Sequence, residues 1–129
     1  MPAHNVLRQM MQNTLHALYP PLCATCGAQV DGQGRLCGTC WRETSFIRGK
    51  VCDACGLSLA GPVDDEADYC DGCLSASRPW QQGRGAVTYE GTGRKLVLAL
   101  KHGDRLELAA PVARWMVDAA KSMTLHDPL

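Results

Sequence analysis

The sequence predicts a small, metal-stabilised fold: an N-terminal helix, two tandem four-cysteine ribbons, and then the beginning of an α/β segment with one strand and two helices. The chain is short, at 129 residues, and only 5% of these are aromatic, so the apolar core is limited. It holds eight cysteines, which all lie between residues 22 and 74 in four Cys-x-x-Cys pairs. The other apolar residues of that region are scattered, so the region needs a cross-link such as a bound metal ion in place of a conventional core.

Residues 5–18 are predicted to form an amphipathic helix within an N-terminal segment 1–21. Asn5 is expected to cap this helix and Pro20-Pro21 to end it. Its polar face carries only Arg8 and His16, which is too little charge for binding to an anionic membrane. We therefore expect no membrane contact, and we expect the apolar face to pack on its own domain or on a second copy of the chain. That face recurs at three- and four-residue steps and consists of Leu7, Met10, Met11, Leu15 and Leu18.

The eight cysteines predict two bound metal ions. Two residues between ligands allow both sulfurs of a tight turn to point at one ion, and zinc takes four ligands in a tetrahedron. Eight thiolates therefore make two closed sites with no position for water, which is the arrangement of structural rather than catalytic zinc. We predict two structural Zn²⁺ ions with the following ligands: Cys23, Cys26, Cys37, Cys40, Cys52, Cys55, Cys70 and Cys73.

The order of the four pairs predicts which of them share an ion. The first and third pairs lie 29 residues apart, and each is followed by a glycine, Gly27 or Gly56. A glycine here suits a zinc knuckle, a tight turn in which backbone N–H groups approach the cysteine sulfur. The second and fourth pairs are each followed by a large apolar residue, Trp41 or Leu74. This internal repeat predicts tandem sites, 23/26/37/40 and 52/55/70/73. The alternative is an interleaved cross-brace, but such sites usually include a histidine, and residues 22–74 contain none.

The compartment expected for the chain bears on the state of its cysteines. No run of about 18 apolar residues is present, and the first twenty residues lack the features of a secretory signal. We therefore expect a cytoplasmic protein, whose thiols are kept reduced rather than paired as disulfides. Four pairs without a surrounding βαβ pattern argue against a redox motif. An iron–sulfur cluster stays possible, although its usual cysteine spacings are denser.

The chain changes character after the last cysteine. Residues 75–83 look like a linker. Residues 84–129 look like the incomplete N-terminal part of a further domain, because one strand and two helices cannot close a domain of their own. The strand is expected at residues 86–89, followed by a turn at residues 90–93.

Two helices are expected in this last segment. The first is an apolar run from Leu96 to Leu100 that ends near residues 101–103. Pro111 suits the first turn of the second. The apolar face of this second helix is expected to hold Val112, Trp115, Met116, Ala119 and Met123.

The charge pattern excludes a generic polybasic tail for nucleic acid. Thirteen basic residues balance thirteen acidic ones, and two four-thiolate zinc sites would bring the holo protein to about −4. The charges are unevenly placed, since residues 53–71 carry only acids and residues 78–105 mostly bases. This pattern suggests a local anion contact or two faces that meet, with solvated surface as the simpler interpretation.

Short motifs surround the cysteine pairs in a fixed order. Tyr19-Pro20-Pro21-Leu22 precedes the first pair, and Tyr89-Glu90-Gly91 follows the last. Then come Leu96-Val97-x-x-Leu100-Lys101 and Gly103-Asp104. Over nearly the whole chain, this order resembles that of the ComF/GntX family of bacterial proteins.

The resemblance implies a double zinc ribbon joined to a phosphoribosyltransferase-type domain, and a link to DNA uptake in competence. It also implies nucleic acid or DNA-uptake proteins as partners. In that family two acidic residues and a Thr/Gly-rich turn hold the ribose phosphate, but this sequence reaches Leu129 before any such motif, and Asp64-Asp65 lacks the turn. We therefore expect the N-terminal part of a ComF-like protein, inactive by itself, and we assign it no catalytic or cofactor-binding residue.

One candidate phosphate site lies in the chain itself. A helix N-terminus at Gly91-Thr92-Gly93 could bind phosphate, with Lys95 and Lys101 nearby, although a plain turn is the simpler interpretation. Lys101 and Arg105 could add charge at the edge of such a site, and their simpler interpretation is as surface cations.

The alternative function is a free-standing double zinc ribbon module that binds nucleic acid or a protein partner. Binding of a single strand uses aromatic side chains among basic ones. Trp41, directly after Cys40, also suits a role as cover for the zinc site. A cross-brace adaptor of the ubiquitin type needs interleaved sites and fits poorly. The aromatic and basic candidates are Trp41, Phe46, Trp80, Tyr89, Arg42, Arg48, Lys50, Arg78 and Arg84.

Overall fold

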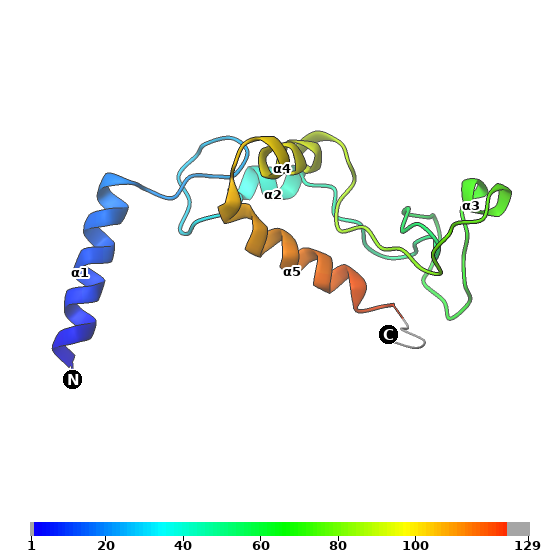
Figure 1. Ribbon diagram of the computed structural model, residues 1–129, viewed down its shortest axis with the longest axis horizontal. Helices are drawn as coiled ribbons and strands as arrows, with labels where there is room; N and C mark the ends of the chain where they lie inside the picture. The colour runs from blue at the N-terminus through cyan, green and yellow to red at the C-terminus, as the bar shows by residue number, and fades with distance from the viewer. Residues whose placement is uncertain (1, 124–129) are drawn as a thin grey trace.

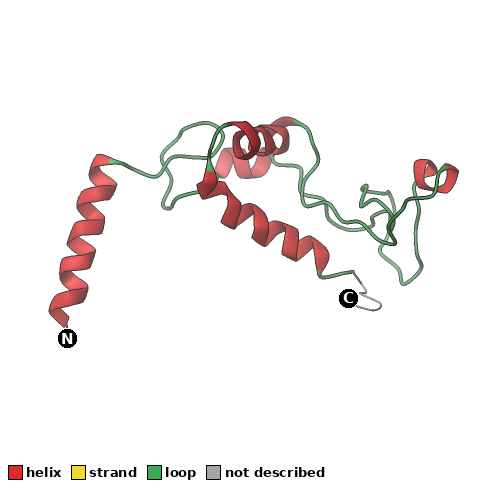
Figure 2. Ribbon diagram, viewed as in Figure 1, coloured by secondary structure: helices red, strands yellow, loops and turns green. Residues whose placement is uncertain are grey.

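The computed structural model describes residues 2–123, with side chains from residue 5 onward, and shows an extended arrangement of helices and loops (Figure 1). The end of the predicted segment 84–129 lies outside the described residues. Within the described range every regular element is helical, and the strand expected in the α/β segment is absent (Figure 2). The elements are α1 (Pro2–Leu18), α2 (Gly38–Glu43), α3 (Asp71–Ser75), α4 (Gly91–His102), the 3₁₀ helix η1 (Leu106–Leu108) and α5 (Ala109–Ala120).

Helix α1 projects away from the rest of the chain (Figure 1). It begins at Pro2, so Asn5 lies inside the helix and the predicted cap at Asn5 is wrong. Proline is favoured at the first helical position because its fixed φ suits the helix and its missing N–H has no intrahelical partner there. The predicted end is confirmed, since the helix stops at Leu18 before the two prolines.

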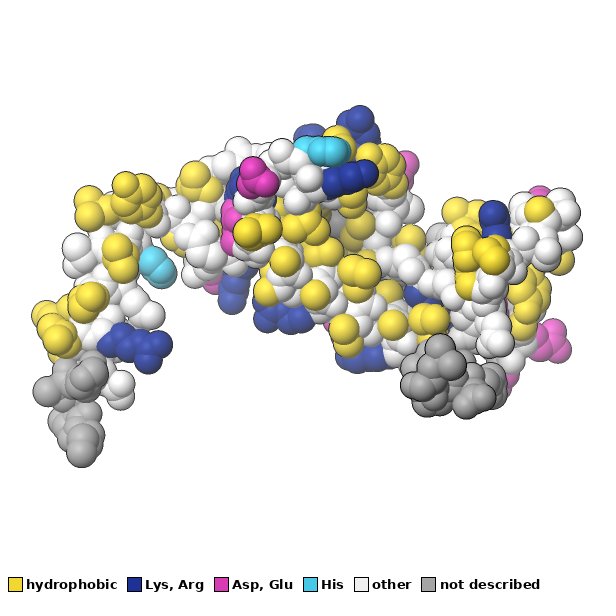
Figure 3. All heavy atoms as spheres, in the orientation of Figure 1, with side chains coloured by type: hydrophobic (Ala, Val, Ile, Leu, Met, Phe, Trp, Pro, Cys, Tyr) yellow, Lys and Arg dark blue, Asp and Glu magenta, His cyan; other side chains and the backbone are white. Residues whose placement is uncertain are grey.

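The apolar face of α1 does not pack on the chain's own body. Every side chain from residue 5 to residue 18 is exposed. The predicted contact with its own domain is therefore wrong, and contact with a second copy stays a prediction. Hydrophobic side chains lie on the surface of α1 (Figure 3), and its large apolar residues are between 53% and 69% exposed: Val6, Leu7, Met10, Met11, Leu15 and Leu18.

The two ribbons repeat the same knuckle. In the first ribbon (residues 21–44), an isolated bridge joins Leu22 to Gln29, and the Cys23 N–H donates to the Ala28 carbonyl at 2.6 Å. In the second ribbon (residues 50–76), the bridge joins Val51 to Ser58, each 29 residues later along the chain. These contacts confirm the predicted internal repeat in the backbone itself.

Each ribbon closes with a short helix that its second cysteine pair begins. Cys37 is the N-cap of α2 and Cys70 is the N-cap of α3. The hydroxyl of Thr44, which ends α2, donates to the Cys40 carbonyl at 2.7 Å and is buried there. The helix start therefore fixes the positions of both ligands in the closing pair.

The segment expected as a strand, residues 86–89, makes only an isolated bridge between Val87 and Phe46. Two backbone hydrogen bonds flank the bridge: the Ile47 N–H donates to Ala86, and the Thr88 N–H donates to Ser45. The prediction of a strand is wrong because the partner segment, residues 45–47, continues into the second ribbon after these contacts. Two paired segments alone do not form a stable sheet.

The two helices expected after the ribbons are present with different starts. Helix α4 begins at Gly91, so residues 91–93, expected as a turn, form its first turn. It ends at His102, as expected, and the N–H of Gly103 donates to the Ala99 carbonyl. Helix α5 carries Pro111 in its first turn, as predicted, and η1 leads directly into it.

The core of the protein lies between the first ribbon, α4 and η1. Ala24 from the first knuckle packs with Leu96 and Leu108, both of which are almost fully buried. Trp115 of α5 packs against this cluster, as expected for the α5 face, whereas Met116 is 60% exposed. The first ribbon and the helices after residue 90 therefore share one core.

Residues 75–83, expected as a linker, run along the second ribbon. The Trp80 indole N–H donates to the Ala54 carbonyl at 2.6 Å, and the Gly83 N–H donates to the Asp53 carbonyl at 3.0 Å. The next residue, Arg84, pairs with the Asp53 carboxylate at 2.6 Å and is largely buried. These contacts join the second ribbon to the segment that follows it.

In residues 2–123, no helix has the length and apolar content needed to cross a bilayer.

Gly34 joins the first ribbon to η1, and it provides a test of the packing. Its φ is +71°, and a Cβ at this position would lie 2.4 Å from the Glu107 carbonyl oxygen. We expect Gly34→Ala to lower the free energy of unfolding by more than about 1 kcal/mol, because both the backbone conformation and the contact with η1 are incompatible with alanine. Urea denaturation of the zinc-loaded protein measures this.

The matched control is Gly38→Ala, at the first position of α2, where a Cβ would meet only an Arg42 side-chain atom at 3.9 Å. This variant should be at least as stable as the wild type. Equal stability of all three proteins would show that the junction between the first ribbon and η1 does not depend on Gly34.

Candidate metal centres

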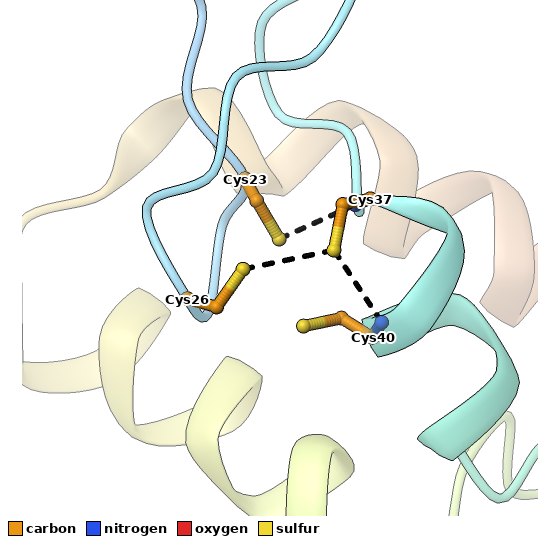
Figure 4. Close-up of side chains that lie close together, drawn as sticks. All are labelled: Cys23, Cys26, Cys37 and Cys40. Atoms are coloured by element: carbon orange, nitrogen blue, oxygen red, sulfur yellow. Dashed lines mark hydrogen bonds between the residues drawn. The ribbon is translucent and has the colours of Figure 1, made fainter.

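The first four-cysteine cluster has the geometry of a tetrahedral metal site. Its four sulfur atoms lie within 4.8 Å of one another, and those of Cys26 and Cys37 are 3.6 Å apart. A tetrahedron with Zn–S distances of about 2.3 Å has edges of about 3.8 Å. Figure 4 shows the side chains of Cys23 and Cys26 from the knuckle and of Cys37 and Cys40 from the start of α2 converging on one point.

Backbone N–H groups point at the sulfurs of this cluster. The Cys37 N–H donates to the Cys23 sulfur at 3.3 Å, and the Cys40 N–H donates to the Cys37 sulfur at 3.5 Å (Figure 4). Such bonds spread the negative charge of the thiolates without a cationic side chain. They follow from the local fold, because the N-cap and the first turn of α2 leave the amides of Cys37 and Cys40 without intrahelical partners.

The second cluster repeats this arrangement and adds a cation. The sulfurs of Cys52, Cys55, Cys70 and Cys73 lie within 4.8 Å of one another, with 3.7 Å between Cys55 and Cys70. The Arg78 Nε–H donates to the Cys73 sulfur at 3.4 Å. A bound zinc ion with four thiolates carries a net charge of −2, so the guanidinium offsets part of the charge at this site.

Thiol pKa values diverge within the first site. Burial raises the pKa of Cys23, but hydrogen bonds from the Thr25 hydroxyl and from the backbone N–H groups of Cys26 and Cys37 outweigh burial and lower it to about 5. The Thr25 hydroxyl lowers the pKa of Cys40, but burial and the neighbouring cysteines raise it to about 12.

The second site shows the same divergence. Burial raises the pKa of Cys52, whereas the backbone N–H groups of Cys70 and Cys55 lower it to about 6. The Leu57 N–H lowers the pKa of Cys55, but burial and the other cysteines raise it to about 12. Each site therefore has a thiol with a lowered pKa, Cys23 or Cys52, and a thiol with a raised pKa, Cys40 or Cys55, whose proton zinc must displace as it binds.

Two residues near the sulfurs were not found by sequence reasoning. The Thr25 hydroxyl lies 3.5 Å from the Cys23 sulfur, at a place where the second knuckle has Ala54. This difference between the two knuckles is the sequence feature that could have identified Thr25 as a neighbour of sulfur. Arg78 lies five residues beyond Cys73 in a segment that resembles a linker, so nothing in the sequence marked it as a neighbour of sulfur.

The fold brings together some of the aromatic and basic residues proposed for binding of a single strand, since Trp41, Phe46, Arg48 and Arg84 line one groove, and it separates the others. Trp80 bonds to the second ribbon, whereas Trp41 and Phe46 pack together with centroids 4.6 Å apart. Lys50 pairs with both Asp64 and Asp68, at 3.1 and 2.9 Å.

The other basic candidates differ in their surroundings. Arg42 is exposed on α2, Arg78 contacts Cys73, and Arg84 pairs with Asp53. Beyond the ribbons, Arg105 pairs with Glu107, and Lys101 is exposed near the end of α4. Trp41, expected as a cover for the zinc site, has Phe46 and Trp115 as its aromatic neighbours.

Comparison with known protein families assigns the metal-binding part of the chain. Residues 14–81, more than half of the sequence, match the double zinc ribbon domain. The chain belongs to the double zinc ribbon family. No curated protein and no solved structure matches this double zinc ribbon protein. Its two four-cysteine sites fit two structural zinc ions, as predicted, and the tandem pairing is confirmed because each cluster draws on consecutive pairs.

The tandem pairing can be tested by zinc content. The wild-type protein should hold about two zinc ions per chain, and Cys26→Ser and Cys55→Ser about one each, because each variant loses one ligand of a different tetrahedron. Elemental analysis of reconstituted protein measures the zinc. A wild-type value below about 1.5 would contradict two sites. Amide spectra identify the ribbon that each variant disturbs, and the same ribbon disturbed in both would indicate interleaved sites.

Removal of zinc should unfold more than the ribbons. Zinc binding to such sites contributes on the order of 10 kcal/mol to folding. Ala24 lies beside Cys23 and within the core with Leu96, so loss of the first site should also loosen α4. With a chelator we expect the amide dispersion of residues 22–74 to collapse and the fluorescence of Trp115 to change. Native dispersion in metal-free protein would contradict this expectation, and added Zn²⁺ should restore the spectrum.

Proposed function

We propose that this chain is the zinc-binding N-terminal part of a ComF-like protein of the phosphoribosyltransferase family, with a role in DNA uptake during competence. The observation that carries the proposal is the order of motifs around the ribbons. Tyr19-Pro20-Pro21-Leu22 leads into the first knuckle, and Leu96-Val97-x-x-Leu100-Lys101 with Gly103-Asp104 follows the second ribbon. A double zinc ribbon without these flanking motifs would not favour this family over others.

The packing of the segment after the ribbons supports this proposal. Leu96 of α4 and Leu108 of η1 pack on Ala24 of the first ribbon, and α4 contacts α2. Asp104, in the Gly103-Asp104 motif, has a φ of +49° at the sharp turn between α4 and η1. The motif residues beyond the ribbons therefore hold these helices against the zinc site, as a scaffold for a following domain requires.

The apolar surface of this segment also supports a scaffold role. Val97, Leu106, Met116 and Val117 are between 39% and 76% exposed on α4, η1 and α5. Exposed large apolar side chains on neighbouring elements are typical of a surface that another part of a protein covers. A phosphoribosyltransferase-type domain that continues from α5 would bury these residues.

The zinc ions have a structural role in this proposal. All four positions around each ion are filled by thiolates, so no metal-bound water is available for hydrolysis. The first turn of α4, the candidate phosphate site, is closed as well: Thr92 is 3% exposed, and a Cβ on Gly93 would lie 2.2 Å from the Thr88 carbonyl oxygen. The chemistry of the family would depend on residues outside this segment.

Two genetic experiments test this proposal. The genomic sequence downstream of the codon for Leu129 should contain, in frame, two acidic residues followed by a Thr/Gly-rich turn. In a naturally transformable host, replacing Cys26 and Cys55 together by serine in the full-length protein should abolish transformation. Normal transformation by this double variant, at wild-type protein level, would overturn the role in DNA uptake.

The chain by itself should not bind phosphoribosyl pyrophosphate. Titration calorimetry with this compound and Mg²⁺ should show no measurable heat, because Thr92 and Gly93 are buried and the acidic pair Asp64-Asp65 is not followed by a Thr/Gly-rich turn. A dissociation constant tighter than about 100 μM, which corresponds to about −5.5 kcal/mol, would show a working phosphate site in residues 84–123. Lys95→Gln and Lys101→Gln would then identify whether α4 provides it.

A further inference from the structure

A groove runs between α5 and the two ribbons. Its volume is about 850 Å³, within the range of about 300–1,000 Å³ that ligand sites span. One wall is formed by residues 46–49, which join the ribbons, and by residues 84–86, which follow the second ribbon. The other is a single face of α5, and because α5 rises about 1.5 Å per residue this wall is roughly 12 Å long from Pro111 to Ala119. Ser122 lines the groove just beyond the end of α5, and the residues of the helix face recur mostly at three- and four-residue steps: Pro111, Arg114, Trp115, Asp118 and Ala119.

Three aromatic rings form a fixed apolar surface in the groove. Trp115 meets Phe46 edge-to-face with centroids 5.2 Å apart, and it meets Trp41 at 5.9 Å. Trp41 is tilted on Phe46 at 4.6 Å and remains 45% exposed. The rings therefore pack against one another and present a joint apolar surface to the groove, not a row of separate flat faces.

The charge around this surface is positive. Arg35 and Arg84 line the groove but are paired with Asp31 and Asp53. Arg48 lies over the Phe46 ring at 5.4 Å, and Arg114 is exposed on α5.

Neither Arg48 nor Arg114 forms an ion pair with a carboxylate of residues 5–123. The carboxylate of the groove, Asp118, is paired with Lys121. Two arginines beside an apolar surface are thus available to a ligand.

We propose that this groove binds an amphipathic segment of a partner protein, with apolar side chains against the three rings and carboxylates beside Arg48 and Arg114. A groove alongside a helix, apolar at its base and charged at its rim, is the arrangement that accepts an amphipathic helix. This proposal does not rest on the proposed function, because the groove lies within the described residues and uses none of the zinc ligands.

Two other occupants fit the groove less well. A single strand of nucleic acid carries one negative charge per nucleotide and binds by stacking on open aromatic faces. Here Arg48 and Arg114 are the two arginines of the groove without a carboxylate partner in the described range, Asp118 is acidic, and the rings pack on one another. Helix α1 of a second copy has Arg8 and no acidic residue, so it offers nothing to the two arginines.

The experiment uses the zinc-loaded chain and two labelled 14-residue peptides. Both carry leucines at helical positions i, i+3, i+4 and i+7; one has glutamate at the other positions and the other has lysine. The glutamate peptide should bind about tenfold more tightly than the lysine peptide in fluorescence anisotropy, and it should shift the indole N–H signal of Trp115. Absence of saturable binding by the glutamate peptide, or equal binding of both, would overturn the proposal.

Charge reversal provides the sharper test. In the double variant Arg48→Glu/Arg114→Glu the preference should invert, so that the lysine peptide binds more tightly. The matched control is Arg8→Glu/Arg94→Glu, which changes net charge equally at exposed arginines of α1 and α4 that do not line the groove. This control should keep the wild-type preference, and zinc content shows that both variants are folded.

A single-stranded oligonucleotide distinguishes the remaining alternative. It should neither displace the glutamate peptide nor shift the Trp115 signal. An oligonucleotide that binds the wild type and the Arg8→Glu/Arg94→Glu control but not the Arg48→Glu/Arg114→Glu variant, and displaces the peptide, would overturn the proposal and assign the groove to nucleic acid.

Discussion

Tetrahedral coordination by four thiolates is the constraint on which the rest of this structure depends. Seven apolar residues are buried in the described chain, and three of these are cysteines of the two clusters. So small a core cannot offset the conformational entropy that the chain loses when it folds. Zinc supplies the difference, because each ion fixes two distant turns at once and its binding free energy becomes folding free energy.

The two ribbons share a plan but are held in the protein differently. The first ribbon is held by apolar packing, since Ala24 of its knuckle lies in the core with Leu96 and Leu108. The second ribbon has Asp53 at the equivalent position, and this residue pairs with Arg84. The two knuckles thus differ at this position: Ala24 packs the first ribbon against the helices, whereas Asp53 links the second ribbon to the following segment by a polar contact.

The uneven charge of the sequence has a structural explanation. Acidic residues 53–71 and basic residues around them meet within one chain, through Asp53 with Arg84 and through Lys50 with Asp64 and Asp68. Hydrogen bonding to Lys50 lowers the pKa of Asp64, and the two carboxylates raise the pKa of Lys50. Two faces that meet therefore describes the pair of Asp53 and Arg84, whereas most other charged residues of the two stretches are exposed, as the interpretation of solvated surface predicts. Within the groove, Arg35 and Arg84 are paired with carboxylates, so Arg48 and Arg114 are its distinctive cations.

The sequence by itself determined the local structure around each metal ion. Ligand identity, tandem pairing and the knuckle repeat follow from spacing and from Gly27 and Gly56, because two residues between cysteines leave few ways to direct both sulfurs at one ion. The end of α1 before Pro20 and the last turn of α4 before Gly103 were equally local and equally predictable. The tertiary structure decided what depends on distant partners. Residues 86–89 pair with residues 45–47 too briefly to form a strand, Trp41 meets Trp115 across 74 positions, and Arg78 reaches Cys73. Those contacts depend on how the first ribbon, the second ribbon and α5 pack together, and no periodicity within one segment encodes that packing.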